Sequence, residues 1–171
     1  MAAQVVKIED FDAGRFLIPS NDFQTDTLQN YLDKYERHYL LRLLGLDLYN
    51  LFIADLDAQG VPQNPDYLAF YEAFADESNG CNCESQGIKE MLKALLYFHY
   101  IRDTYTRATT TGPKRSKGEN SENLDKVAHD ITTRYNEGVE SFECIQKFIS
   151  KNRATYPTFN GWEDVEKVLF I

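Results

Sequence analysis

Three cysteines and two histidine–aspartate pairs are the residues of this 171-residue chain whose types and spacing best fit a chemical role. Cys81 and Cys83 are separated by one residue and supply two of the four ligands that a zinc site normally requires. Cys144 and one of His99 or His129 would have to complete the set, and no second closely spaced pair supports it. We therefore interpret all three cysteines as structural, two in a loop and one in a helix, and expect no bound metal.

The second arrangement pairs His99 with Asp103 and Asp125 with His129. The spacing of four residues places both members of each pair on one face of a helix. Carboxylate-bridged di-iron bundles use Glu-x-x-His on two helices and further glutamates on the others, and this pattern is missing here. A histidine that is solvated or hydrogen-bonded beside an aspartate is therefore the simpler interpretation.

Residues 112–117, Gly-Pro-Lys-Arg-Ser-Lys, superficially suggest a phosphate-binding loop. They lack the second glycine directly before Lys and Ser or Thr, and they follow a predicted helix instead of a strand. The sequence also lacks the nucleophile-elbow, zinc-protease and dinucleotide-binding motifs. We expect no catalytic residue and no cofactor, so the chain does not read as an enzyme.

Charge and hydropathy limit the remaining classes of protein. A net charge of −9 argues against general coating of nucleic acid, because phosphate binding needs clustered Lys and Arg. The most apolar runs, 39–52 and 94–101, are too short or too interrupted by charge to span a bilayer, and the first residues lack the apolar core of a secretory signal. The odd number of cysteines argues against a disulfide framework and favours a reducing, cytoplasmic site of synthesis.

Hydrophobic periodicity predicts an all-α fold, a helical bundle of about five helices with a long helical hairpin, a protruding loop and extended termini. A capping box at 21–24 begins a helix that runs to about Leu44, and Gly45 separates it from a helix over 46–56. Asn64 and Pro65 begin a short third helix, and 76–84 read as a turn. The fourth helix runs from about residue 85 through the apolar centre 94–101, and the fifth from a cap at Ser121 to about residue 151, with Gly138 as its weak point.

Three regions are predicted along the chain: an N-terminal arm or strand over 1–20, a helical domain over 21–152 and a tail over 153–171. The tail reads as a loop followed by a short apolar element. Its last four residues need a partner, either the chain's own body or a neighbouring subunit, because exposed apolar side chains forfeit burial energy. These residues are Val168, Leu169, Phe170 and Ile171.

The connection between the fourth and fifth helices is positively charged, whereas the rest of the chain is negatively charged. It carries Arg107, Lys114, Arg115 and Lys117 and has no acidic residue from 107 to 118. One interpretation is an exposed loop kept soluble by its charge. The other is a docking tip for an acidic protein surface or a nucleic-acid backbone, presented at the end of a rigid hairpin.

Several phrases of the sequence resemble a known family. They are Leu-Gln-Asn-Tyr-Leu-Asp-Lys-Tyr (28–35), Leu-Leu-Gly-Leu-Asp-Leu-Tyr (43–49), Gly-Ile-Lys-Glu-Met-Leu (87–92), Tyr-Phe-His-Tyr-Ile-Arg (97–102), Thr-Thr-Thr-Gly (109–112), Asn-Ser-Glu-Asn (120–123) and Arg-Tyr-Asn (134–136). Together they resemble the small helical head–tail connector (adaptor) proteins of tailed bacteriophages, particularly those of crAss-like and related phages. The resemblance covers roughly residues 20–165 and carries no catalytic signature.

The resemblance implies a structural virion protein of the phage neck, made in the host cytoplasm. Such proteins form a ring, usually of twelve copies, that joins the portal to the tail-side neck proteins and extends the DNA channel. They contact the passing genome without sequence specificity and bind no membrane. An acidic chain suits such a channel, because a negative lumen repels the phosphates of the duplex.

Two other classes remain open from the sequence. The first is a cytoplasmic helical protein-binding module or regulator, monomeric or dimeric, that holds one protein with its aromatic surface. The second is a metal-dependent helical-bundle enzyme, for which the candidate ligands are Cys81, Cys83, His99 and His129.

Overall fold

The computed structural model describes residues 4–18, 25–76, 83–109, 112–115, 124–161 and 163–168, with the backbone alone for 25–26, 105–109, 112–115 and 124–128. The described part contains five α-helices, two short 3-10 helices and four short strands. In chain order they are η1 (Ile8–Phe11), η2 (Gly14–Phe16), α1 (Thr25–Leu44), α2 (Leu46–Asp55), α3 (Pro65–Tyr71), β1 (Phe74–Asp76), β2 (Cys83–Ser85), α4 (Ile88–Tyr105), β3 (Thr106–Thr109), β4 (Gly112–Arg115) and α5 (Leu124–Lys151).

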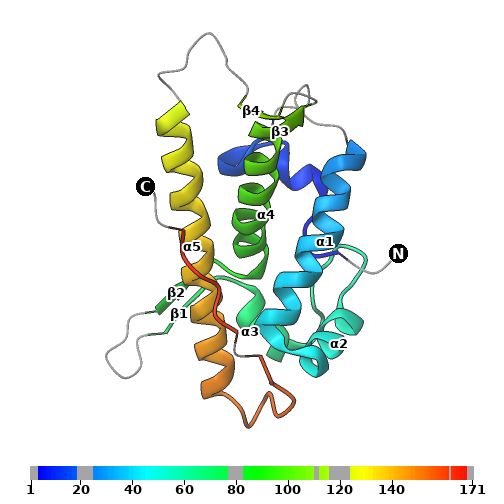
Figure 1. Ribbon diagram of the computed structural model, residues 1–171. Coiled ribbons are helices and arrows are strands. Elements are labelled where there is room, and N and C mark those ends of the chain that lie inside the picture. The colour runs from blue at the N-terminus through cyan, green and yellow to red at the C-terminus, as the bar shows by residue number, and fades with distance from the viewer. Residues whose placement is uncertain are drawn as a thin grey trace.

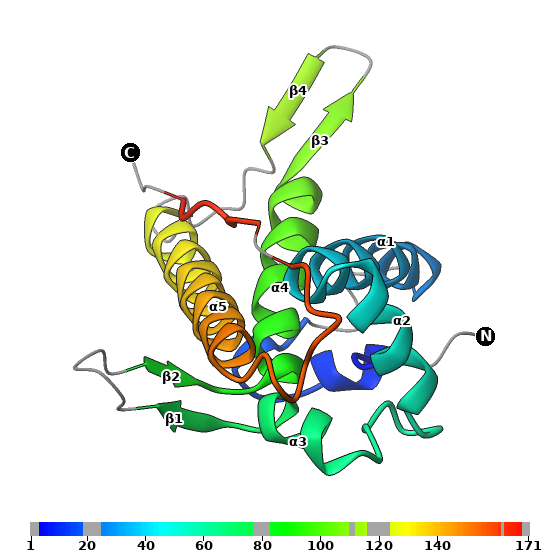
Figure 2. The ribbon, with the colours of Figure 1, turned by 90° about the horizontal axis from the view of Figure 1, so that it is seen from below.

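Three long helices lie side by side and form the body of the molecule. Helix α4 lies between α5 on one side and α1 on the other, and the short helices α2 and α3 lie at one end (Figures 1 and 2). The central position of α4 explains why its apolar middle is buried on nearly every side, including Leu92, Leu95 and Leu96. The prediction of an all-α bundle with a long α4–α5 hairpin is confirmed.

Helix α5 is continuous through Gly138, where the sequence predicted a weak point. A Cβ atom on Gly138 would lie 3.0 Å from the Cβ of Ala94 and 3.3 Å from Cδ2 of Leu95. The glycine therefore lets α5 pack closely against α4. Tertiary packing at this crossing outweighs the low helix propensity of glycine, which costs only about 1 kcal/mol.

The predicted boundary between α1 and α2 is confirmed at Gly45, whose φ of +74° favours glycine. The tail crosses this corner, because the backbone nitrogen of Gly161 lies 2.8 Å from where a Cβ on Gly45 would be. The start of α3 is also as predicted: Asn64 caps it by accepting a hydrogen bond from the Asp66 N–H, with Pro65 as the first helical residue. The caps predicted at 21–24 and at Ser121 lie outside the described residues.

The N-terminal segment contains no strand in its described part and packs into the core. Phe11, Phe16 and Ile18 are buried there, on and beside the two 3-10 helices. The segment is held by Glu36 of α1, whose carboxylate oxygens accept hydrogen bonds from the backbone N–H groups of Val5 and Val6 at 3.1 and 2.9 Å.

The described part of the tail has no helix or strand, and it also packs on its own chain. Tyr156, Phe159 and Val165 are buried. The hydroxyl of Tyr156 donates a hydrogen bond to the backbone oxygen of Asp66 at 2.5 Å. The tail thus joins α5 to the α2–α3 end of the body.

Two antiparallel ribbons lie where the sequence predicted a turn over 76–84 and a loop over 107–117. The loop prediction was wrong for the strand residues 107–109 and 112–115, and the turn prediction missed the strands at its two ends, while residues 77–82 lie outside the described residues. Strand β1 pairs with β2, and β3 pairs with β4. The first pair has only three residues in each strand, too few to show an alternating pattern. The second contains Gly112 and Pro113, which are typical of loops, although Thr106 and Thr109 favour a strand.

Candidate functional site

The β3–β4 ribbon carries the basic residues that the sequence analysis proposed as a docking tip. Helix α4 ends at Tyr105 and β3 begins at the next residue, so the ribbon continues directly from the helix. It extends clear of the five helices (Figure 2). The hairpin is therefore confirmed as a projecting element, but as a β-ribbon and not as an irregular loop.

The register of the ribbon places one pair of basic residues opposite each other. Arg107 stands opposite Lys114, and Thr106 stands opposite Arg115. Like charges at facing positions disfavour strand pairing, by up to about 1 kcal/mol. Lys117, the fourth proposed residue, lies outside the described residues.

Val168, the one described residue of the proposed apolar tail contact, is held by its own chain. Its backbone N–H donates to the side-chain oxygen of Asn136 at 2.9 Å, and the Asn136 amide donates back to the Val168 carbonyl at 3.0 Å. This pair of bonds ties the tail to α5, and the Val168 side chain is half-buried. Leu169, Phe170 and Ile171 lie outside the described residues.

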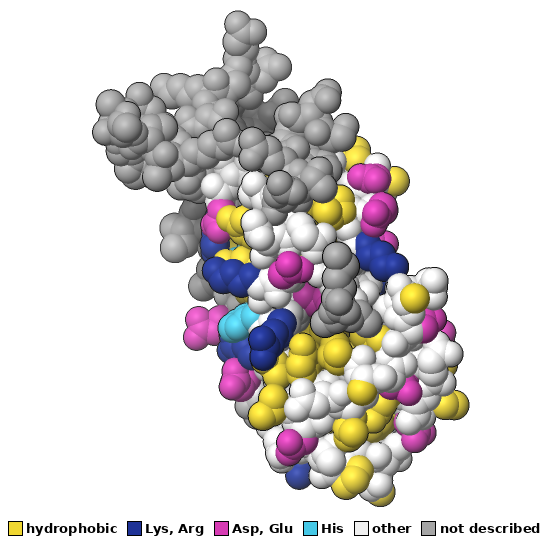
Figure 3. All heavy atoms as spheres, turned by 90° about the vertical axis from the view of Figure 1, so that its right-hand side faces the viewer, with side chains coloured by type: hydrophobic (Ala, Val, Ile, Leu, Met, Phe, Trp, Pro, Cys, Tyr) yellow, Lys and Arg dark blue, Asp and Glu magenta, His cyan; other side chains and the backbone are white. Residues whose placement is uncertain are grey.

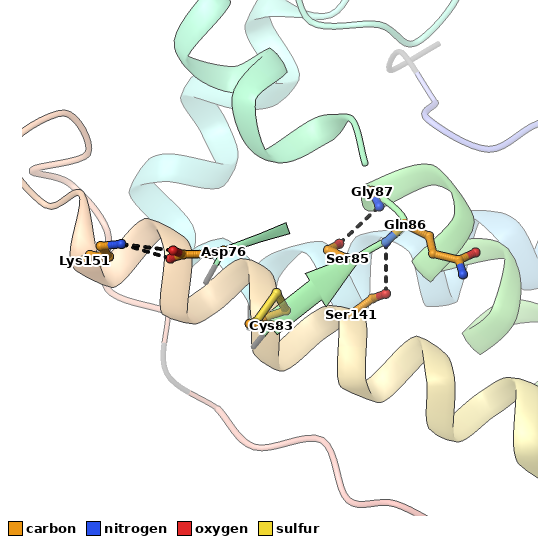
Figure 4. Close-up of a disulfide and its surroundings, with 8 residues drawn as sticks. Asp76, Cys83, Ser85, Gln86, Gly87, Ser141 and Lys151 are labelled. Atoms are coloured by element: carbon orange, nitrogen blue, oxygen red, sulfur yellow. Dashed lines mark hydrogen bonds and ion pairs between the residues drawn. A yellow bond between two sulfur atoms is a disulfide. The ribbon is translucent and has the colours of Figure 1, made fainter. Parts of the chain in front are cut away.

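The structure contradicts the expectation of a chain without a disulfide, and it places Cys83 in a strand instead of a loop. Cys83 of β2 and Cys144 of α5 form a disulfide, with their Cα atoms 5.6 Å apart (Figure 4). The two residues are 61 positions apart, and only the packing of β2 against α5 brings them together. Their sulfurs are bonded to each other. Cys81 lies outside the described residues.

Polar contacts reinforce the attachment of the β1–β2 ribbon to α5. The ammonium group of Lys151 lies 3.1 Å from both carboxylate oxygens of Asp76 (Figure 4). At the other end of the ribbon, the Gln86 N–H donates to the hydroxyl of Ser141 at 3.4 Å. The disulfide and these contacts hold the ribbon on α5 along its length.

His99 lies in a stack of aromatic rings and not in a ligand cluster. The ring of Tyr35 is parallel to it, with centroids 4.1 Å apart, and the Tyr39 hydroxyl lies 2.5 Å from Nε2. Burial, helped by the nearby Arg102 charge, lowers the pKa of His99 to about 4. The ring is therefore neutral at physiological pH. Its Nδ1 atom is buried and has no hydrogen-bond partner among the described residues.

Asp103 binds tyrosine and arginine side chains. Its carboxylate accepts hydrogen bonds from the Tyr31 hydroxyl and from Nε of Arg102, both at 2.9 Å. Burial, followed by the bond to Asp103, raises the pKa of Tyr31 to about 12. The interpretation of a hydrogen-bonded histidine near an aspartate is thus confirmed in part, because His99 is hydrogen-bonded to Tyr39 and Asp103 to Tyr31 and Arg102, and not to each other.

The second pair, Asp125 and His129, is described only at His129, which is exposed. Among the described residues, no group of three or more histidine, cysteine or acidic side chains is placed to hold a metal ion. Within the same residues, no helix is both long and apolar enough to cross a membrane.

Glu36 is the residue that the sequence analysis missed. Its side chain is 5% exposed, and burial raises the pKa of its carboxyl to about 7, against the opposing hydrogen bonds from Val6 and Val5. The signal was present, because Glu36 is four residues from both Leu32 and Leu40 on the apolar face of α1.

A pocket of about 170 Å³ opens between η2, β2, α4 and α5. Most of its charged lining residues are paired within the chain. Arg15 forms an ion pair with Glu137, and the Arg134 guanidinium donates to the backbone oxygen of Arg15. Glu90 is paired with Lys93 at 2.7 Å. The pocket therefore offers little unpaired charge to a ligand.

The described part of the chain thus has a projecting β3–β4 ribbon whose sequence is basic, and two strongly exposed leucines on α2, Leu46 and Leu51. Comparison of the chain with protein-family models, with curated proteins and with solved structures found no match.

Proposed function

We propose that this protein is a structural subunit of a tailed-phage neck, where copies form a ring that joins the portal to the tail and extends the DNA channel. The observation that carries the proposal is the projecting β3–β4 ribbon, a basic element on a chain of net charge −9. The ribbon continues directly from α4, and α4 packs along α5 more extensively than any other two described elements pack together. A force on the tip of the ribbon would therefore be passed to these two helices.

The charge distribution supports a role as a channel for DNA. An acidic subunit surface repels the phosphates of a passing duplex and so prevents sticking. The basic ribbon supplies the opposite sign where a firm contact is needed, on an acidic patch of the portal or of an adjacent ring subunit. Contact between the ribbon and the exiting DNA is the weaker alternative, because one short ribbon neutralises few phosphates.

The disulfide supports a protein that works outside the reducing cytoplasm. Such bonds persist on virions and other extracellular particles and are rare in cytosolic proteins. A neck protein is made in the cytoplasm and leaves it with the particle, so its Cys83–Cys144 bond would close during or after release. This consideration favours a virion component over a cytoplasmic regulator.

The test is assembly with the portal protein of the same phage. The purified chain, alone and mixed with the portal, is measured by native mass spectrometry and imaged in negative stain. We expect closed rings, or a ring of copies bound to one end of the portal. A chain that stays monomeric or dimeric under all conditions and does not bind the portal would contradict the proposal. That result would favour a module that binds one protein.

A further inference from the structure

The inner end of the β1–β2 ribbon is anchored in the folded chain. Phe74 stands opposite Ser85 at this end, and Ser85 is 1% exposed. The Ser85 hydroxyl accepts a hydrogen bond from the Gly87 N–H at 3.1 Å. A Cβ atom on Gly87 would collide with the backbone oxygen of Tyr71, so the backbones on the two sides of the ribbon touch where it leaves the body. Noncovalent packing therefore fixes the inner end.

The outer end of the ribbon is held in a different way. Cys83 stands opposite Asp76 there, and its sulfur is bonded to that of Cys144 on α5 (Figure 4). The ion pair between Asp76 and Lys151 lies at the surface, with the two side chains 24% and 47% exposed. Exposed ion pairs contribute little to stability, because water competes for both charges. The disulfide is therefore the strongest described attachment of the outer end to α5.

The two bonded cysteines differ in burial. Cys144 is 2% exposed and lies on the side of α5 that β2 covers, whereas Cys83 is partly exposed. A thiolate breaks a disulfide by attacking one of its sulfur atoms, so it must be able to approach that atom. A dissolved thiol therefore reaches the sulfur of Cys83 more easily than that of Cys144.

We propose that the Cys83–Cys144 bond is a redox latch for the outer end of the β1–β2 ribbon, and that low-molecular-weight thiols such as glutathione open it at Cys83. A thiolate attacks the Cys83 sulfur, forms a mixed disulfide there and releases the Cys144 thiolate, which takes up a proton. A second thiol then displaces Cys83. Two small thiols are thereby oxidised to one small disulfide, and the protein disulfide is reduced to two thiols. The small disulfide closes the latch by the reverse steps.

Opening the latch frees the ribbon locally. The inner end keeps its anchors, so β1 and β2 should swing away from α5 and uncover Cys144 while the helices stay folded. The chain thus has a movable ribbon in a reducing compartment and a fixed ribbon in an oxidising one. This device does not depend on the neck proposal, since it requires neither a portal nor a ring.

The first experiment measures how Cys144 becomes accessible when the bond is absent. The full chain with Cys81→Ser and Cys83→Ser keeps Cys144 as its only cysteine, and iodoacetamide labels it at urea concentrations below the unfolding transition. The rate is measured where it is proportional to the reagent concentration. Opening of the ribbon exposes little surface, so the logarithm of the rate should change with urea far less steeply than the equilibrium m value of the same variant predicts. A slope equal to that m value, or no labelling below the transition, would overturn the latch.

Matched variants test whether the ribbon is the part that opens. In the same single-cysteine chain, Lys151→Gln removes the ion pair with Asp76 and should speed the labelling of Cys144 about two- to fivefold. Lys147→Gln removes an equal charge at an exposed position of the same helix and should leave the rate unchanged.

A second control lies away from the ribbon. Apolar side chains gather on the surface of the other side of the molecule, over α1 and α2 (Figure 3), and Leu51 of α2 is 49% exposed. Leu51→Ser should therefore leave the labelling rate of Cys144 unchanged. Equal acceleration by Lys151→Gln, Lys147→Gln and Leu51→Ser would show that a general loss of stability exposes Cys144, and it would overturn the latch.

The second experiment locates the exchange reaction. Oxidised glutathione is added to two full chains that keep one thiol each, Cys81→Ser/Cys144→Ser and Cys81→Ser/Cys83→Ser, and the adducts are followed by intact-mass spectrometry. The adduct on Cys83 should form about tenfold faster than the adduct on Cys144, because access limits the buried thiol. Equal rates, or a faster reaction at Cys144, would overturn the inference. The neck proposal would stand in either case, since neither experiment measures assembly.

Discussion

Glu36 is an ionisable group buried under the N-terminal segment, and its surroundings make it sensitive to pH. Burial raises the pKa of its carboxyl to about 7, and the charges of Asp33 and Asp10 add to the effect, against the hydrogen bonds from Val6 and Val5. A carboxyl group whose pKa is higher in the folded state stabilises the fold below its unfolded pKa. That contribution is lost as the pH rises through the folded pKa.

Replacement of Glu36 by glutamine should remove this pH dependence. The ordinary pKa of a glutamate carboxyl, 4.5, applies to the unfolded chain. The free energy of unfolding of the wild type should therefore fall by roughly 3 kcal/mol relative to that of Glu36→Gln between pH 4.5 and 7.5. Urea unfolding of both proteins at several pH values measures the difference. The exposed Glu166→Gln is the control, and a difference for Glu36→Gln that does not change with pH would contradict the assignment.

His99 acts in the opposite direction, which is why the comparison between variants is needed. Its pKa is lowered to about 4 from the ordinary histidine value of 6.5, so its contribution is present above pH 6.5 and is lost as the pH falls through about 4. In the wild type, this change partly cancels that of Glu36. It is common to the wild type and to Glu36→Gln, so it drops out of their difference.

The disulfide between Cys83 and Cys144 should contribute strongly to stability. It closes a segment of 61 residues, for which loop-closure entropy predicts about 4 kcal/mol. Cys144→Ser should therefore lower the free energy of unfolding by about 2–4 kcal/mol, and reductant should lower that of the wild type to a similar value. Cys81→Ser is the control and should behave like the wild type. Equal stability of Cys144→Ser and the wild type without reductant would show that the bond contributes nothing.

At the scale of elements, the close crossing of α4 and α5 depends on Gly138. A methyl group at this position gains helix propensity of about 1 kcal/mol but meets Ala94 at 3.0 Å. Overpacking typically costs about 1–3 kcal/mol, so we expect Gly138→Ala to lower stability by about 1 kcal/mol. Ala94→Gly removes the opposing methyl group at its own helix-propensity cost of about 1 kcal/mol, so Gly138→Ala should cost less in that background than in the wild type. A double-mutant cycle by urea unfolding measures the coupling, and additivity of the two changes would contradict a direct contact.

Helices were predictable from the sequence where a local signal marks them. Gly45 separates α1 from α2, and the Asn64–Pro65 pair begins α3, because these residues favour their own backbone geometry whatever surrounds them. The role of Gly138 was not predictable, because the same residue weakens an isolated helix and permits a close helix crossing. Only the position of Ala94 on the neighbouring helix decides between the two.

The candidate site was predictable in composition but not in structure. The charge of residues 107–117 identified the tip, whereas the β3–β4 pairing depends on the register between strands that contain loop-forming residues. The disulfide could not be predicted, since nothing in the local sequence of Cys83 or Cys144 indicates that β2 packs on α5. Glu36 could have been found from the periodicity of α1 alone.

The β3–β4 ribbon should act in binding and not in folding. Changing Lys114, Arg115 and Lys117 to Glu should leave the thermal melt nearly unchanged, because the ribbon projects from the helical body and substitutions away from packed features rarely alter stability by more than about 0.5 kcal/mol. Binding to the portal, or to an adjacent subunit, should weaken because like charges would then face each other. The defect should shrink as salt is added.

A matched control separates this local effect from the change in net charge. Lys34, Lys147 and Arg153 are exposed on the helical body and its tail, and their change to Glu alters the net charge equally. This control should bind almost normally. Equal binding by the ribbon variant and the wild type, with equal stability, would mean that the ribbon is only a solvated connection.

At the scale of the whole molecule, the basic ribbon is the contact that we propose between the ring and its neighbour in the neck. This contact is ionic, so added salt should weaken portal binding. The acidic remainder of the surface is left to face the DNA.

Localisation in the particle tests the central claim most directly. Single-particle cryo-electron microscopy of the phage neck, with mass spectrometry of purified virions, should find this chain in a closed ring between the portal and the tail. Its α4–α5 hairpin should be recognisable, with the β3–β4 ribbon against the portal or an adjacent subunit. Absence of the chain from purified virions, or a neck whose rings are built wholly from other proteins, would contradict the account.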